Sequence, residues 1–356
     1  MNFVRTLTGC LILVGSLASG VVHAELEDVL KRPSLPTQLA TKRPLNAVVA
    51  TASRLIAVGA RGHIVYSDNN GASWTQAAVP VSSDLTAVYF SSDASGWAVG
   101  HDGVVLHTQD AGQTWALQFD GNQAAELIRT YYAKKAEEGD EQARSLLPEI
   151  ERDFAGGADK PFLDVWFAND SDGFIVGAFN MIFRTRDGGK SWTPWYERID
   201  NPRRLHIYAI RGRGGRVYAV GELGLFTRLD ADAQRFVAEP SPYAGSFFGV
   251  LPVSDGALVF GMRGNAYHVD DGAGQWHKLD IGVVGGLTGA AALADGRVAM
   301  VSTAGDVVLG HPANGGFEKL QSIRPMAFAG VAFVGPTNAL AFVGNNGTSV
   351  AALPRK

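Results

Sequence analysis

Short apolar segments recur along most of this chain, and turns rich in glycine separate them. Between residues 55 and 67, for example, an apolar run ends in valine and glycine, a turn follows, and a second apolar run begins. Such short runs between turn residues predict β-strands joined as hairpins, because helices need longer stretches with helical periodicity. The same order of run, turn and run returns many times. The pattern therefore predicts an all-β protein built from one repeated unit.

An eight-residue phrase closes three of the units and reads SDNNGASW at 67–74, TQDAGQTW at 108–115 and TRDGGKSW at 185–192. Its third residue is Asp or Asn, which can accept hydrogen bonds from amides further along the turn, and its fifth is glycine, which supplies a positive φ. The final tryptophan is large enough to seal one sheet against the next. We therefore expect a structural role, in repeat turns, for Asn69, Gly71, Trp74, Asp110, Gly112, Trp115, Asp187, Gly189 and Trp192.

The spacing of the units gives their number. The aligned glycine of each unit, or the serine in its place, falls at Gly59, Gly100, Gly177, Gly221, Gly261, Ser302 and Gly344. Successive differences are 41, 77, 44, 40, 41 and 42 residues, so six steps separate seven units. A period near 40 residues with four short strands is typical of a propeller blade. The pattern predicts a seven-bladed β-propeller.

The two ends of the chain are expected to meet in the last blade. The seventh unit stops near residue 353 without an outer strand, whereas residues 36–44, PTQLATKRP, precede the first inner strand. We expect this N-terminal segment to supply the missing strand and so to close the ring. Closure of this kind would remove exposed sheet edges, which otherwise favour aggregation.

One step is longer than the others because residues 121–160 interrupt the pattern between the second and third units. Ala, Glu, Lys, Gln and Leu dominate this segment, and its apolar residues, among them Tyr131 and Tyr132, fall at helical spacing. It predicts a helical insertion that Gly139 and Pro148 break or bend. Two interpretations stay open. The apolar stripe packs on the protein's own propeller, or the insertion binds a partner, since function concentrates on loops held by rigid scaffolds.

The N-terminus indicates export. Arg5 precedes an apolar run, and a small-residue cleavage site follows, so residues 1–24 are predicted to be a signal peptide and residues 25–356 a single propeller domain. The only cysteine, Cys10, lies in that peptide, so the mature chain would be held by packing alone. We expect a periplasmic, lumenal or extracellular protein.

Composition and charge limit the classes of partner that this protein is expected to bind. The 356 residues are 46% hydrophobic and include 43 glycines, which suits a turn-rich β protein with ample apolar material for a core. The net charge of −4 does not indicate nucleic acid as a partner. No segment after the signal peptide has the length of a membrane span. We expect a monomer that binds a protein.

The turns that follow each Val-Gly pair differ from unit to unit. Strand alternation puts these turns and the helical insertion on the face opposite the repeated phrases. Unlike residues around a propeller axis can form a binding platform, although a solvated polar rim is the simpler interpretation for any one of them. The candidate partner-binding residues are Arg61, His101, Asp102, Phe179, Asn180, Arg203, Arg204, Arg211, Arg213, Arg263, Tyr131 and Tyr132.

Catalysis is not expected from this platform. Propellers with such turns include sialidases, which use a tyrosine nucleophile, an acid and arginines, whereas ordinary glycosidases need two carboxylates. Asp102 and Glu222 are the only acids in the variable turns, and no tyrosine accompanies them in a recognisable motif. The histidines lack metal-ligand spacing. We expect no catalytic residue, metal or cofactor, and a glycan-binding or sialidase-like propeller is the alternative.

The repeated unit, in which a Gly-x-x-Gly turn leads to Thr-x-Asp-x-Gly-x-Thr-Trp, resembles the BNR or Asp-box repeats of the photosystem II assembly and stability factor family. The resemblance extends over about residues 45–353. It implies an exported seven-bladed propeller that acts as a non-catalytic scaffold and binds a membrane-protein precursor or envelope complex. Family members carry an arginine-rich patch and an insertion between early blades. In this chain, features similar in kind to that patch and that insertion are the helical insertion and Arg203, Arg204, Arg211, Arg213 and Arg216.

Overall fold

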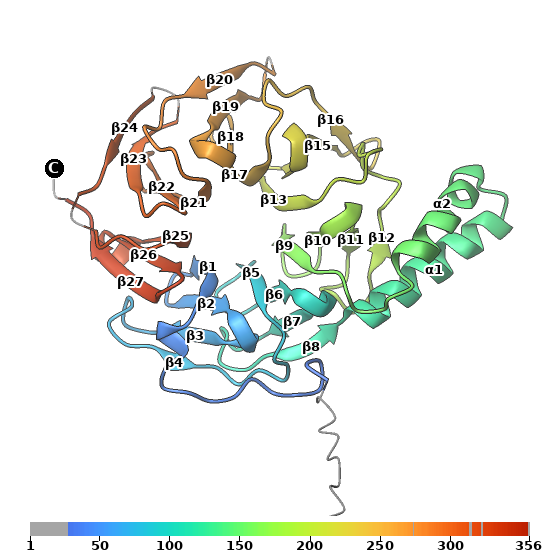
Figure 1. The fold of residues 1–356 in the computed structure, drawn as a ribbon, viewed down its shortest axis with the longest axis horizontal. Coiled ribbons are helices and arrows are strands. Elements are labelled where there is room, and N and C mark those ends of the chain that lie inside the picture. The colour runs from blue at the N-terminus through green and yellow to red at the C-terminus, as the bar shows by residue number, and fades with distance from the viewer. Residues whose placement is uncertain (1–27, 273, 313–314, 322, 355–356) are drawn as a thin grey trace, which may run out of the picture.

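Figure 1 shows small β-sheets arranged around a central opening, with two helices projecting at the rim. The computed structural model describes residues 28–272, 274–312, 315–321 and 323–354. The predicted signal peptide, residues 1–24, lies outside the described residues. Each sheet is an antiparallel meander whose strands follow one another in chain order. This is the local order that the run–turn–run pattern predicts.

Seven sheets follow one another along the described part of the chain. The first three contain β1 (Leu45–Ala50), β2 (Leu55–Gly59), β3 (Ile64–Ser67) and β4 (Thr75–Gln76); β5 (Leu85–Phe90), β6 (Gly96–Gly100), β7 (Val105–Thr108) and β8 (Ala116–Phe119); and β9 (Phe162–Phe167), β10 (Gly173–Gly177), β11 (Ile182–Thr185) and β12 (Thr193–Pro194). The next two contain β13 (Ile207–Arg213), β14 (Arg216–Gly221), β15 (Phe226–Asp230) and β16 (Arg235–Ala238); and β17 (Phe247–Val253), β18 (Gly256–Gly261), β19 (Ala266–Asp270) and β20 (Trp276–Leu279). The last two contain β21 (Leu287–Ala292), β22 (Val298–Ser302), β23 (Val307–His311) and β24 (Gly315–Lys319); and β25 (Phe328–Val334), β26 (Ala339–Gly344) and β27 (Gly347–Ala352).

The sheets form a propeller-like ring. The innermost strand of each sheet lies beside the innermost strands of the sheets before and after it, and β25 of the last sheet lies beside β1 of the first. These innermost strands line a central channel of about 540 Å³. The second strand of each sheet is enclosed on both faces, as in β2, where all five residues are buried. The hydrophobic core therefore lies between neighbouring sheets.

The last sheet differs from the prediction, because it has three strands and the N-terminal segment does not join it. Within residues 36–44 the chain forms a short 3-10 helix, η1 (Ala40–Lys42), in which the Lys42 amide donates to the Leu39 carbonyl at 2.9 Å. The expectation of an N-terminal closing strand was wrong because these amides bond locally. The segment instead packs against the ring, with the carbonyl of Thr41 set directly over Gly347 of β27.

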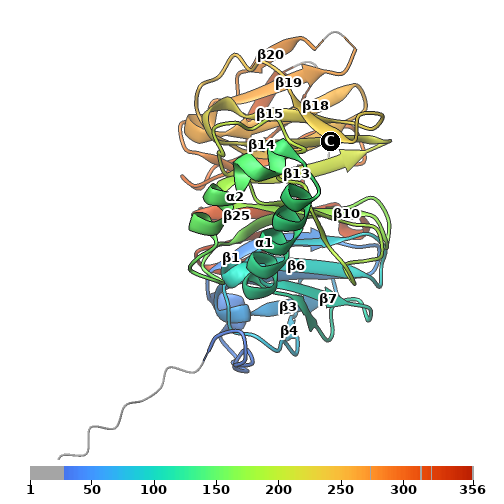
Figure 2. The same ribbon diagram turned by 90° about the vertical axis from the view of Figure 1, so that its right-hand side faces the viewer.

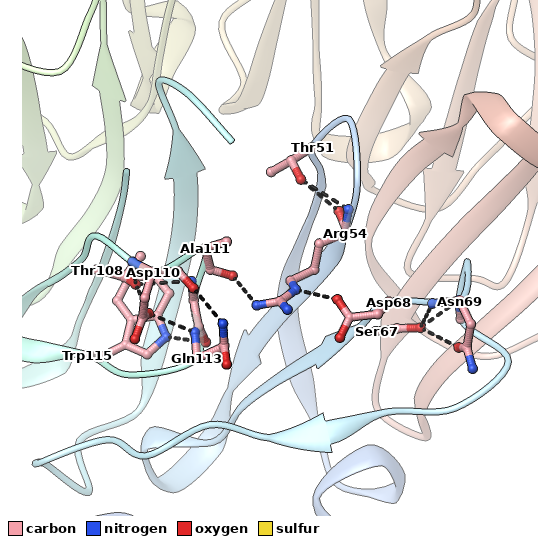
Figure 3. Close-up of polar contacts among 12 residues, drawn as sticks. Thr51, Arg54, Ser67, Asp68, Asn69, Thr108, Asp110, Ala111, Gln113 and Trp115 are labelled. Atoms are coloured by element: carbon pink, nitrogen blue, oxygen red, sulfur yellow. Dashed lines mark hydrogen bonds and ion pairs between the residues drawn. The ribbon is translucent and has the colours of Figure 1, made fainter. Parts of the chain in front are cut away.

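The repeated phrases build the turns that their composition predicts. In the second sheet, the Thr108 hydroxyl donates to Asp110 at 2.8 Å (Figure 3). Asp110 also accepts from the Thr114 amide at 2.9 Å. Gly112 has a φ of 84°, which favours glycine. Asp187 makes the same bonds with Thr185 and Ser191. Arg54 then joins two such turns, because it donates to Asp68 of one and to the Ala111 carbonyl of the next (Figure 3).

Two of the three phrase tryptophans are sealed between sheets as expected. Trp115 and Trp192 are buried, and the Trp115 indole donates to the Gly112 carbonyl at 3.1 Å. Trp74 is only half-buried, because it lies where the first sheet meets the three-stranded last sheet. The missing outer strand therefore leaves one tryptophan with less cover.

The long interval between the second and third sheets contains two helices, α1 (Gly121–Glu137) and α2 (Glu141–Asp153), as the helical spacing of apolar residues predicts. Asp120 and Gln123 form a capping box at the start of α1, and Gly139, with a φ of 97°, separates the helices. Pro148 lies inside α2 and does not end it. Figure 2 shows the helices side by side at the rim. Among the described helices, none is long and apolar enough to cross a bilayer.

Candidate partner-binding face

The ring has two unlike faces. Antiparallel strands put the repeated phrases at one end of each sheet, and we call this end the box face. The opposite end carries five short turns, and we call it the η-turn face. These turns are η2 (Ala60–Gly62), η3 (His101–Gly103), η4 (Ala178–Asn180), η5 (Glu222–Gly224) and η6 (Met262–Gly264).

The five turns share one backbone conformation. The middle residue is never glycine, yet its φ lies between 51° and 57°, and the next residue also has a positive φ. Two successive positive φ values define a type I′ hairpin turn, which favours Asn-Gly or Asp-Gly. The middle residues here are Arg61, Asp102, Phe179, Leu223 and Arg263.

Packing explains why a glycine follows the middle residue in four of the five turns. The glycine that follows in η2, Gly62, lies directly against the Val81 carbonyl, and Gly224 of η5 lies against the Tyr243 carbonyl in the same way. A side chain at either glycine would collide with the backbone of the connection to the next sheet. The middle side chains instead point outward, and Arg61, Phe179 and Arg263 are exposed while Asp102 is half-buried. The neighbouring His101 is exposed as well.

Asn180 takes the place of glycine in η4 and is not available to a partner. It is buried, its amide group donates to the Tyr196 carbonyl at 3.0 Å, and its side-chain oxygen accepts from Asn201 at 2.8 Å. The prediction of Asn180 as a binding residue needs correction. The side chain anchors the turn that presents Phe179.

Arg204 is also engaged by ion pairs within the molecule. Its guanidinium forms ion pairs with Glu149, at 2.6 Å, and with Asp153, both of α2, and donates to the Tyr196 hydroxyl at 2.9 Å. Arg204 therefore fixes the insertion to the ring. Arg203 beside it is exposed and forms no ion pair within the described residues.

The tyrosines of α1 face the ring. Tyr132 is fully buried and its hydroxyl donates to Glu197, which also pairs with Lys135 at 3.0 Å. Burial, together with the Glu197 carboxylate, raises the pKa of Tyr132 above its usual value. Tyr131 is half-buried. The structure therefore supports the first of the two interpretations, in which the stripe packs on its own propeller, and it removes Tyr132 from the candidate surface.

The remaining predicted arginines lie elsewhere. Arg211 is in β13, where it pairs with buried Asp164 and lines the central channel. Arg213 is exposed at the other end of β13, and this end belongs to the box face. The expectation that Arg213 shares the platform was wrong, because β13 runs through the full depth of the ring.

An arginine groove at the rim was not anticipated. Arg184, Arg186 and Arg198 line a cavity of about 370 Å³ with Trp195. The Arg184 guanidinium lies 5.0 Å from the Trp195 ring centre and also pairs with Asp172 at 2.8 Å. Arg184 lies in β11, Arg186 in the turn after it and Arg198 in the connection after β12, so their positions in the sequence carried no visible signal.

No three His, Cys, Asp or Glu side chains among the described residues are grouped so as to hold a metal ion. Glu222, one of the two acids in the variable turns, is engaged by His206, whose Nδ1 lies 3.1 Å from the carboxylate. Asp102 comes from the second sheet and Glu222 from the fourth, so they lie on sheets that are not neighbours in the ring. This is not the paired arrangement that a glycosidase needs.

The ring of sheets and the repeated turns define this protein as a β-propeller. The chain belongs to the family of the photosynthesis system II assembly factor YCF48, whose family model matches residues 34–130 and 155–313. The unmatched stretch between these ranges contains the end of α1 and all of α2. The chain matches none of the curated proteins with which it was compared.

Solved structures show the same fold at low identity. The chain is similar to "YCF48 bound to D1 peptide", with a TM-score of 0.65 and 15% identity over 90% of this chain and 96% of that one. It is also similar to YCF48 from Cyanidioschyzon merolae, with a TM-score of 0.64 and 13% identity over 88% and 96%. The WD40 propeller domain of Doa1 gives a TM-score of 0.65 and 10% identity over 92% and 97%. At these identities the likeness concerns the fold.

Proposed function

We propose that this protein is an exported, non-catalytic assembly factor that binds a protein of a membrane or envelope complex through its η-turn face. The observation that carries the proposal is the set of five rigid turns that hold unlike side chains outward from one backbone framework. Family membership supports an assembly role, and a structural neighbour was solved with a peptide of D1 bound. By analogy, the client would be a membrane-complex subunit of the photosystem kind.

The proposal includes three further points. The mature chain is a single seven-bladed propeller that works as a monomer, and it acts in the periplasm, the lumen or outside the cell after cleavage of residues 1–24. The acids of the variable turns, Asp102 and Glu222, do not act as a catalytic pair. Turnover of a sialoside or glucan that is lost on Asp102→Ala or Glu222→Ala would contradict this last point.

A charge reversal on each face tests the proposal. Arg263 on the η-turn face and Arg213 on the box face are both exposed and form no ion pair within the described residues. We expect Arg263→Glu to reduce capture of the client complex from solubilised envelope membranes about tenfold. This corresponds to a loss of roughly 1.4 kcal/mol in binding free energy. Arg213→Glu should capture as the wild type does. The bait is expressed with its own N-terminal segment, and the mass of the recovered protein reports whether that segment is removed.

Two outcomes would contradict the proposal. Loss of capture by Arg213→Glu with normal capture by Arg263→Glu would put the partner on the box face. Failure of the wild type to retain any envelope protein after crosslinking would exclude the assembly role.

A further inference from the structure

Four large apolar side chains are exposed together on one part of the η-turn face. Phe179 of η4 is 46% exposed, Leu223 of η5 is 48%, Met262 of η6 is 39%, and Val284, in the connection after β20, is 89%. They come from the third, fourth and fifth sheets, which are consecutive in the ring. We call these four residues the apolar arc. Exposed apolar side chains on consecutive turns of one face are a feature that interaction surfaces use.

Two members of the arc are held in a conformation that their side chains disfavour. Phe179 has a φ of 52° and Leu223 a φ of 51°, the left-handed region that asparagine and glycine occupy most easily. The structure gains little from either side chain, because each is about half exposed. Backbone strain that persists at exposed bulky residues is typical of binding sites.

The arc is continuous with the central channel. The Phe179 ring lies 4.6 Å from the His206 ring, His206 lies 6.2 Å from Tyr208, and Tyr208 lies 5.7 Å from Phe248. Tyr208 and Phe248 line the mouth of the channel. Beneath Leu223, a hollow of about 190 Å³ is shared with Arg203. The surface is therefore grooved, which suits an extended chain better than a flat bilayer.

Two arginines beside the arc have no ion-pair partner among the described residues. Arg203 shares the hollow of Leu223, and Arg263 follows Met262 directly; neither forms an ion pair within the described residues. The nearby acids are engaged by other groups: Glu222 by His206 at 3.1 Å, and the two acids that line the hollow, Asp200 and Glu239, by Arg235 and Arg228. A complementary ligand needs apolar side chains for the arc and carboxylates for the two arginines.

We propose that the apolar arc binds an extended segment of the client in which apolar side chains alternate with carboxylates. This inference rests on the proposed function and names the chemistry of the segment that is bound. Phe179 and Leu223 contact its apolar side chains, and Arg203 and Arg263 attract its acids.

Leu223→Asn and Phe179→Asn test the inference, because they remove the apolar groups and relieve the backbone. Leu223→Asn also restores the Asn-Gly pair that a type I′ turn prefers. The probe is a fluorescein-labelled synthetic peptide in which leucine and phenylalanine alternate with aspartate and serine. We expect each variant to weaken probe binding about tenfold, as loss of an interface anchor does. Leu223→Asn should leave the melting temperature unchanged or raise it.

Matched probes and a control variant complete the experiment. Replacing each aspartate of the probe by lysine should abolish binding to the wild type, and Val237→Asn, an exposed apolar residue of the outer strand β16, should bind as the wild type does. Unchanged probe binding by both arc variants would overturn the inference. So would binding of the wild type to vesicles of anionic lipid that the arc variants lose, with no binding of the probe.

The two proposals fail in different ways. If the arc variants still capture the envelope complex as well as the wild type does, the arc is not the contact and the assembly role stands. If the wild type binds the probe but retains no envelope protein, the arc binds peptides and the assembly role is wrong.

Discussion

At the scale of single residues, a few buried or half-buried polar groups fix the positions of their exposed neighbours. Asp110 organises a repeated turn, Asn180 anchors the turn of Phe179, and Arg204 holds α2. Each of these side chains satisfies several backbone or side-chain groups that would otherwise be unpaired. The residues that face solvent beside them are therefore presented by a rigid frame.

Asp110→Asn tests this role of a turn carboxylate. Although partial burial by itself raises the pKa of Asp110, hydrogen bonds from Thr114, Thr108 and Gln113 lower it below 3.8. The charged form therefore stabilises the fold above that value, and this contribution is lost as the pH falls through the lowered pKa of the folded state. We expect the variant to lose about 1.5–3 kcal/mol near neutral pH, the range for bonds to a charged acceptor.

The measurement is urea denaturation of wild type and variant near neutral pH and near pH 2. The difference in the free energy of unfolding should shrink as the pH falls through the lowered pKa of Asp110 in the folded state. Asp232→Asn, at an exposed position in the turn after β15, is the control and should have no effect at either pH. A difference for Asp110→Asn that does not depend on pH would contradict the argument.

At the scale of elements, the helical insertion is part of the ring's core. Ile128, Tyr132 and Ile150 are fully buried in the same cluster as Phe119 and Phe162 of the second and third sheets. An insertion that packs in this way stiffens the junction between two sheets. The first helix of the insertion, α1, lies beside η3 of the η-turn face.

Arg204→Ala should loosen α2. Removal of the guanidinium leaves Glu149 without its ion-pair partner among the described residues and Asp153 with Arg152 alone, and we expect a loss of about 1.5–3 kcal/mol, as for hydrogen bonds to charged groups. Hydrogen exchange over residues 141–153 should accelerate while exchange in the strands stays unchanged. Arg203→Ala is the neighbouring control, since Arg203 forms no ion pair within the described residues, and it should not alter exchange. Equal acceleration by both variants would show that Arg204 does not hold the helix.

At the scale of the whole molecule, the sequence predicted the architecture well because every unit repeats the same local rules. The spacing of Gly59, Gly100 and their equivalents predicted seven four-stranded units, and the described residues form seven sheets, six of them with four strands. The helical spacing near Tyr131 predicted helices there. Local turn chemistry and periodicity are visible in a sequence, and these features depend on little else.

The predictions that were wrong depend on contacts between residues that are far apart in the sequence. The sequence places Asn180 in a turn. In the structure its side chain is buried and bonded to Asn201 and Tyr196, which lie in a later connection. The N-terminal segment reads as a strand, but its amides bond within a helical turn. The binding role of the exposed candidates Arg61, His101, Asp102, Phe179 and Arg263 stays a prediction.

Gly347→Ala tests how the N-terminal segment holds the seam between the last sheet and the first. Gly347 has a φ of 86° and lies against the Thr41 carbonyl, whereas Gly215 has a φ of 81° and open space around it. Gly215→Ala should cost about 1–2 kcal/mol from its backbone alone. Gly347→Ala should cost about 1–3 kcal/mol more, because the new methyl group displaces the segment. Equal losses in thermal denaturation would mean that the segment does not support the seam.

In the type I′ turns, the backbone conformation must stay constant, whereas the middle side chain is free to differ. Because a following glycine or Asn180 fixes each backbone and most of the middle side chains are exposed, we expect substitutions at these positions that tolerate a positive φ to leave the scaffold largely unaltered. Under the proposed function, related proteins could therefore acquire new clients by single amino-acid exchanges, one sheet at a time, without passing through unfolded ancestors. A protein engineer could randomise the same positions and obtain a library of binders on one stable support.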